Sequence, residues 1–153
     1  MTGRPAEAAD HVLAHVLQKA ARAVTRLNDQ PLRRLGLTSG QAFLLARVGR
    51  GDHPTVGRLA GDLAMDRSTV TALLRPLARD GVIRIAPAER DRRVRCVQLT
   101  ERGSGLNTEA AAEVARLEAM LAARLPFAPA ELRSRLEVIV SLASRERSAA
   151  SGP

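Results

Sequence analysis

The apolar period of this chain changes twice within one short stretch. From Thr55 to Gly81, apolar residues recur every three or four positions, as they do along one face of a helix. The period then changes: residues 82–85, Val-Ile-Arg-Ile, read as a short β-strand. Over 94–99, Val94, Cys96 and Gln98 alternate with Arg95, Val97 and Leu99 in a second strand. A helical period returns after Thr100. The sequence therefore predicts a β-hairpin that directly follows a group of helices along the chain.

Two short helices are predicted before the hairpin. Thr55 can cap the first and Asp66 the second, because their side-chain oxygens can accept the free backbone N–H groups of a helix N-terminus. The two helices are close enough in sequence to form a helix-turn-helix. Pro76 lies inside the second helix and is expected to bend or tighten it. This helix has an apolar stripe, formed by Val70, Leu73, Leu74 and Leu77, and an opposite polar face with Arg67, Ser68, Thr71 and Arg75.

Further amphipathic helices are predicted on both sides of this unit. One occupies about residues 9–27 and is broken by Pro31 and Gly36, and another opens at a capping box formed by Thr38 and Gln41. Two more follow the hairpin, over about 106–125 and 132–143. The outer helices are too long and too apolar to be mere tails, which indicates a helical scaffold shared between two chains.

The predicted fold is mainly α-helical with a small β-hairpin wing. We expect one domain over 1–153, with a winged helix-turn-helix lobe over 37–102 and dimerisation helices over 8–30 and 104–148. Because aromatic residues make up only 1% of the chain, its core must be built from Leu, Val, Ile and Ala.

Positive charge is concentrated in the same region. The formal net charge is +8, and residues 56–102 hold ten arginines against six acidic residues. A preference for Arg codons in the genome could explain why Lys19 is the only lysine, so the placement of the charge is the better guide. A helix fits the major groove of B-DNA, and a thin hairpin that carries Arg can reach the adjacent minor groove. The charge pattern therefore favours double-stranded DNA as the partner.

Several other classes of protein are disfavoured. No segment has the roughly 20 apolar residues that span a bilayer, and the first 30 residues do not resemble a signal peptide, so we expect a cytoplasmic protein without a membrane partner. A single cysteine, Cys96, excludes an intramolecular disulfide and a multi-cysteine zinc site. The sequence contains no Gly-rich phosphate loop, metal cluster or recognisable nucleophile with its base, so we expect neither an enzyme nor a bound cofactor.

Residues 56–103 resemble the DNA-binding lobe of MarR-type transcription regulators. Their sequence is VGRLAGDLAMDRSTVTALLRPLARDGVIRIAPAERDRRVRCVQLTERG. The ordered set of two helices, an Asp-Arg-Arg wing and Leu-Thr-Glu-Arg-Gly carries the resemblance, and the flanking helices extend it over nearly the whole chain. It implies an obligate homodimer that grips a pseudo-palindromic operator. It also implies that Arg93 enters the minor groove and that Asp91 orients the wing through an ion pair. The residues implied to contact DNA are Arg67, Ser68, Thr69, Thr71, Arg75, Arg90, Arg92 and Arg93.

A small-molecule effector is expected to release a repressor of this type from DNA. Its pocket is predicted between the scaffold and the winged lobe, lined by the first, second and long post-hairpin helices. His11, His15 and Phe43 are the candidate lining residues. His11 and His15 are also spaced to share a metal ion, but no third ligand is evident, so we expect no metal site.

Three alternatives remain open at this stage. The wing arginines could form a solvated turn that protects an edge hairpin from aggregation. The chain could be a basic winged-helix module that binds nucleic acid without sequence preference. It could also respond to oxidants through Cys96, although the alternation predicts that Val97 and Leu99 face the core and that Cys96 lies on the other face.

Overall fold

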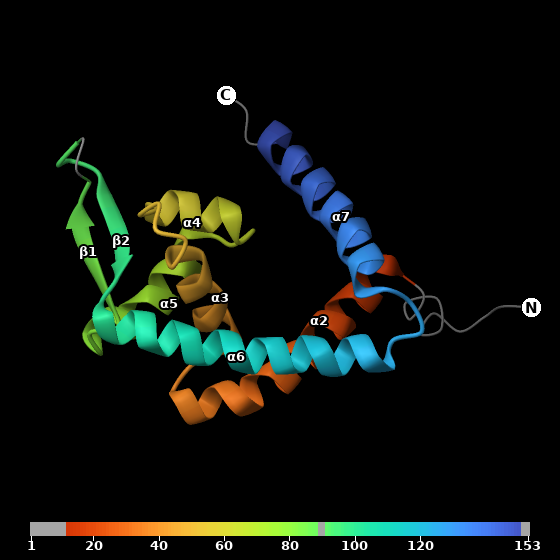
Figure 1. Ribbon diagram of the computed structural model, residues 1–153. Helices are drawn as coiled ribbons and strands as arrows, with labels where there is room; N and C mark the ends of the chain where they lie inside the picture. Colours follow the sequence, from red (N-terminus) through yellow and green to blue (C-terminus); the bar gives the residue numbers. More distant parts are fainter. Residues whose placement is uncertain (1–11, 89–90, 151–153) are drawn as a thin grey trace, which may run out of the picture.

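The computed structural model describes residues 12–88 and 91–150 and is drawn in Figure 1. The elements follow in the order α2 (Leu13–Leu32), η1 (Arg33–Leu35), α3 (Ser39–Val48), α4 (Val56–Asp62), α5 (Arg67–Arg79), β1 (Ile83–Pro87), β2 (Arg95–Leu99), α6 (Glu101–Arg124) and α7 (Pro129–Ala150). The long helix α6 runs from the lobe that holds α3, α4, α5 and the hairpin to the end where α7 turns away (Figure 1). Helix α2 lies beside α6.

The buried core lies in the lobe and is aliphatic, as predicted. α3 supplies Leu44 and Leu45, and α4 supplies Leu59. From α5 come Val70, Leu74 and Leu77, the predicted apolar stripe, with Leu73 packed against this cluster. The other buried apolar residues of the cluster are Leu32, Leu37, Ala42, Val48, Ala60, Val82, Ile83, Val97 and Ala110.

Three threonine caps lie where the sequence predicts helix starts. Thr38 forms the complete capping box with Gln41 at the start of α3, and the Thr55 hydroxyl accepts a hydrogen bond from the backbone N–H of Arg58. Thr100 does the same for Gly103 at the start of α6. Asp66 occupies the N-cap position of α5, but its side chain makes no capping hydrogen bond. The start of α5 is therefore correctly predicted, and its capping bond is not.

The predicted break at Pro31 is wrong, because α2 continues through this residue to Leu32. Proline removes the backbone bond of its own nitrogen, but here the helix ends within two residues, so little further hydrogen bonding is lost. Leu32 is fully buried in the core, and this burial favours the extra turn. The chain reverses instead at Gly36, which has the left-handed φ of 71° that glycine adopts readily.

The wing is a two-stranded antiparallel hairpin. Ile83 pairs with Leu99 at its base and Pro87 with Arg95 at its tip, so Pro87 belongs to β1 and not to the predicted loop. Residues 54 and 55 run along the other edge of β2, where the backbone N–H of Val97 donates to the Pro54 carbonyl at 2.9 Å. β2 is therefore a central strand at this point.

Cys96 lies on the face of β2 opposite Val97, but this face is buried as well, which the sequence pattern did not indicate. Cys96 is 5% exposed and its neighbour Val97 is 1% exposed, so both are buried. Alternating burial requires one face of a strand to be open to water, and the burial of both residues shows that both faces of β2 are covered at this point.

Candidate nucleic-acid interface

Helix α5 presents the polar face that the sequence predicts. The stripe of Val70, Leu74 and Leu77 is buried against the core, which fixes the rotation of the helix about its axis. The opposite face is exposed and consists of Arg67, Ser68, Thr69, Thr71 and Arg75. Pro76 lies inside this helix, as predicted.

Two of these side chains have local contacts. The Thr71 hydroxyl donates a 2.7 Å hydrogen bond to the backbone carbonyl of Arg67, one turn earlier, which leaves the hydroxyl oxygen free to accept. The guanidinium of Arg67 lies across Gly57 of α4, where an added Cβ would be 3.2 Å from Nη2. Sequence reasoning did not single out Gly57, because nothing in the sequence shows that an arginine ten residues later crosses it.

The tip of the wing is held by Asp91. Its carboxylate Oδ1 accepts a hydrogen bond of 2.9 Å from the backbone N–H of Arg93, and its carbonyl accepts one of 3.0 Å from Val94. Within residues 12–88 and 91–150, no ion pair joins Asp91 to the guanidinium of Arg92 or Arg93, and both arginines are exposed. Asp91 thus shapes the turn through the backbone. Arg90 lies outside the described residues.

Further arginines lie near the base and along the strands of the wing. Arg84 on β1 and Arg95 on β2 are exposed, and sequence reasoning named neither as a DNA contact. Arg79 is engaged by Asp80, with Nε to Oδ1 at 2.8 Å. The hydrogen bond from Arg79 holds the pKa of the Asp80 carboxyl below its usual range. Arg79 is therefore partly neutralised, while Arg84 and Arg95 add to the positive surface of the hairpin.

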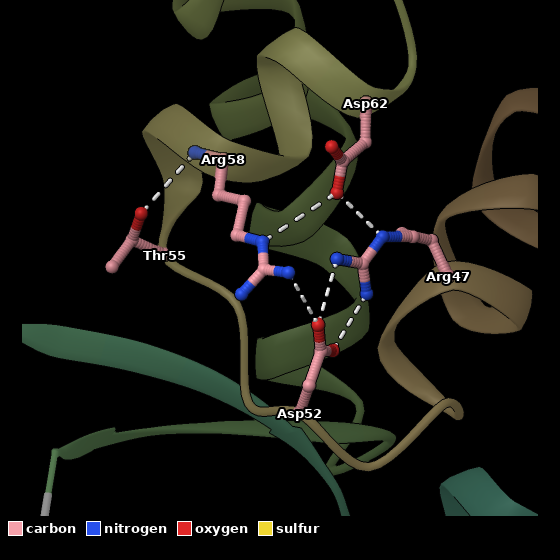
Figure 2. Close-up of polar contacts among 5 residues, drawn as sticks. All are labelled: Arg47, Asp52, Thr55, Arg58 and Asp62. Carbon is pink, nitrogen blue, oxygen red and sulfur yellow. Dashed lines mark hydrogen bonds and ion pairs between the residues drawn. The ribbon is translucent and has the colours of Figure 1, made fainter.

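An ion-pair network joins α3 to α4 (Figure 2). Arg47 of α3 is 8% exposed and binds two carboxylates, with Nε to Asp62 Oδ2 at 2.6 Å and Nη1 to Asp52 Oδ1 at 2.7 Å. Arg58 approaches the same two acids from the solvent side. Arg47 lowers the pKa of Asp52, and the acids raise the pKa of the Arg47 guanidinium. Sequence reasoning did not single out Arg47, whose acidic partners lie five and fifteen residues away along the chain.

The candidate effector residues are not brought together in one cavity. Phe43 is 44% exposed and lines a cavity of about 580 Å³ beside the Arg47 network. His15 is half-buried on α2, and His11 lies outside the described residues. A separate cavity of about 340 Å³ lies between α2, α6 and α7, with Val24, Leu121 and Leu136 in its wall. Among the described residues no group of three potential ligands could hold a metal ion.

The described part of the chain contains no helix with the length and apolarity needed to cross a membrane.

Comparison with known proteins gives one curated relative and many solved structures. No family model matches the chain. The transcriptional activatory protein BadR of Rhodopseudomonas palustris is 32% identical over 90 residues, which cover 57% of this chain. The match spans about half of that relative, 51% of its length.

The solved structures match over most of the chain. The M. tuberculosis transcriptional regulator MosR in complex with DNA has a TM-score of 0.79 and 25% identity, covering 90% of this chain and 99% of that one. MarR from E. coli in its reduced form has a TM-score of 0.68 and 22% identity, covering 83% and 95%. CouR from Rhodococcus jostii RHA1 bound to p-coumaroyl-CoA has a TM-score of 0.73 and 19% identity, covering 86% of this chain and 93% of that one. The last two show the fold alone.

A helix-turn-helix with an arginine-bearing second helix, followed by a hairpin wing and carried on long helices, defines a winged-helix DNA-binding protein. The chain is similar to transcription regulators of the MarR family: it shares its fold with MarR and resembles MosR over most of its length. The predicted resemblance to MarR-type regulators and the predicted mainly helical fold with a hairpin wing are therefore confirmed. Regulators of this family bind DNA and are not enzymes, in agreement with the sequence analysis.

Proposed function

We propose that this chain is a homodimeric repressor that binds a pseudo-palindromic operator through α5 and the wing. The exposed polar face of α5 carries the proposal, because the buried stripe behind it leaves Arg67, Thr71 and Arg75 directed away from the core. In this proposal α5 enters the major groove and Arg93 enters the adjacent minor groove. The similarity to MosR, which was solved in complex with DNA, supports it.

Exposed apolar side chains on the scaffold helices support a homodimer. Leu13 on α2 is 63% exposed, and Val138 and Leu142 on α7 are 58% and 56% exposed. Large apolar side chains gathered on long helices are costly to leave in water and mark association surfaces. We propose that residues 8–30 and 104–148 form the shared scaffold and that residues 37–102 form each DNA-binding lobe. Two-fold symmetry then places the two recognition helices roughly 34 Å apart.

A small-molecule effector acts on this dimer by changing the spacing of the two α5 helices. The cavity between α2, α6 and α7 suits such a role, because all three helices belong to the proposed scaffold. CouR, solved with p-coumaroyl-CoA, is a related fold that takes a ligand. A ligand shifts the dimer away from DNA only by binding the non-fitting shape more tightly than the fitting one.

DNase footprinting of the full chain on the DNA upstream of its own coding sequence, at near-physiological salt, tests the proposal. Symmetric protection of one or a few short sites is the expected result. Protection of all sequences alike, or protection only after salt is lowered, would instead identify a basic module without sequence preference.

A further inference from the structure

We propose that Arg47 is a positioning residue that fixes α4, and through α4 the DNA-reading face of α5, relative to α3. This inference rests on the proposed DNA-binding function, since its consequence is the geometry presented to the operator. Arg47 itself lies behind the interface and is almost fully buried, so it acts through other residues.

The guanidinium of Arg47 is bound along two of its edges. Nη1 and Nη2 donate to the two oxygens of Asp52 at 2.7 and 2.9 Å, and Nε donates to Oδ2 of Asp62 at 2.6 Å (Figure 2). Because the guanidinium is planar and its donors form a rigid fork, the directions to both carboxylates are fixed together. Asp52 lies in the loop that leads into α4 and Asp62 is the last residue of α4, so one side chain binds both the segment before the helix and its C-terminal end.

Backbone strain lies next to both carboxylates. His53 has φ 44° and Ala64 has φ 51°, and these are the non-glycine residues with positive φ in the described part of the chain. One follows Asp52 directly and the other lies two residues after Asp62. Left-handed backbone at such residues costs free energy and persists only where the surroundings determine it. The bonds to Arg47 supply that determination at each end of α4.

Helix α4 is short and buries few of its side chains. It has seven residues, and only Leu59 and Ala60 are buried. α3, in contrast, buries Leu44 and Leu45 and packs on α6, so it provides the fixed frame. The orientation of so short a helix therefore depends strongly on its polar contacts with α3.

Contacts between α4 and α5 also fix the position of α5. The two helices pack together, and the Arg67 guanidinium lies across Gly57 of α4. A tilt of α4 would therefore move the first turn of α5, which holds Arg67 and Ser68. The contact chain from the α3 frame to the operator face runs from Arg47 through the carboxylates to α4 and then to α5.

The test compares Arg47→Gln and Arg47→Lys with wild type in the full chain. Arg116→Gln is the matched control, because it removes the same charge from an exposed ion pair on α6. Two quantities are measured for each folded variant: affinity for the footprinted operator and for a random duplex, and backbone amide exchange along the chain. Lysine keeps the charge but cannot bind Asp52 in a bidentate manner.

We expect Arg47→Gln to bind the operator about tenfold more weakly than wild type, and Arg47→Lys to show a smaller loss of operator affinity. The affinity of both variants for the random duplex should stay within about twofold of that of the control. Amide exchange should quicken over 53–65 and remain unchanged in α2 and α6. Unchanged operator affinity, or faster exchange throughout the chain, would overturn the positioning role. If wild type shows no operator preference, the proposed function fails instead, and the exchange pattern still decides whether Arg47 fixes α4.

Discussion

The carboxylate of Asp91 accepts a 2.9 Å hydrogen bond from the backbone N–H of Arg93 and thereby fixes the turn at the tip of the wing. An aspartate that accepts from the backbone two residues later forms a local turn without any need for a charged partner. The wing arginine is thus held by its own main chain, and its guanidinium remains available to DNA.

Asp91→Asn and Asp91→Ala are expected to differ. Asparagine retains the acceptor oxygen, so operator affinity should change little, whereas alanine loses the turn and should weaken binding several-fold. Titration of a labelled operator measures both. Equal losses in the two variants would show that the negative charge of Asp91 is what matters, as an ion pair requires.

Arg93→Ala is expected to weaken operator binding and to reduce the slope of log affinity against log salt by about one unit, because one cation no longer displaces counterions. Binding measured at several salt concentrations gives the slope. Arg133→Ala, which removes an exposed arginine of α7, is the control and should leave the slope unchanged. An unaltered affinity in Arg93→Ala would contradict the assignment of the wing.

Leu142→Glu is expected to shift the chain from dimer to monomer, because it places a charge within the apolar surface of α7. Sedimentation velocity at several protein concentrations measures the shift. Thr108→Glu adds the same charge at an exposed polar position of α6 and should leave the dimer intact. A monomeric wild type would contradict the proposed scaffold.

Acid is expected to destabilise the lobe through Asp29 and Asp52. Hydrogen bonds from the Ser39 hydroxyl and from the Ser39 backbone N–H, which lies 2.7 Å from Asp29 Oδ1, lower the pKa of Asp29. The hydrogen bond from Arg47 lowers the pKa of Asp52. Groups with a lowered folded-state pKa contribute stability above the unfolded pKa, near 3.9, and lose it as the pH falls further.

Urea unfolding midpoints from pH 7 to pH 3 measure this loss, which should begin below about pH 5. Ser39→Ala removes the largest cause of the lowered pKa of Asp29. Lowering the pH from 7 to 3 should therefore reduce the unfolding midpoint of this variant less than that of wild type. An identical pH profile in the variant would contradict the role of the Ser39 contact.

Cys96 is expected to be inert in the folded protein. Its thiol is buried on a central strand, so alkylation should be slow in buffer and fast in urea, and peroxide should not change operator affinity. Cys96→Ala provides the control for each measurement. A peroxide-dependent loss of binding in wild type that is absent from Cys96→Ala would instead support the redox-responsive alternative.

Local signals in the sequence determined the helix starts and the wing. The caps at Thr38, Thr55 and Thr100 join residues three apart, and the left-handed turn at Gly81 needs only a missing side chain. Such features depend on neighbours in the sequence, so the pattern alone predicts them. The exposed face of α5 follows in the same way from its apolar stripe.

Only the tertiary structure decided the features that depend on distant partners. Arg47 meets Asp62 fifteen residues later, and Cys96 is buried on a strand that also pairs with Thr55. The continuation of α2 through Pro31 to Leu32 depends on the burial of Leu32 in a core built by other elements. Local pattern cannot report these contacts, because the free energy that favours them comes from packing and ion pairing between segments that meet only in the folded chain.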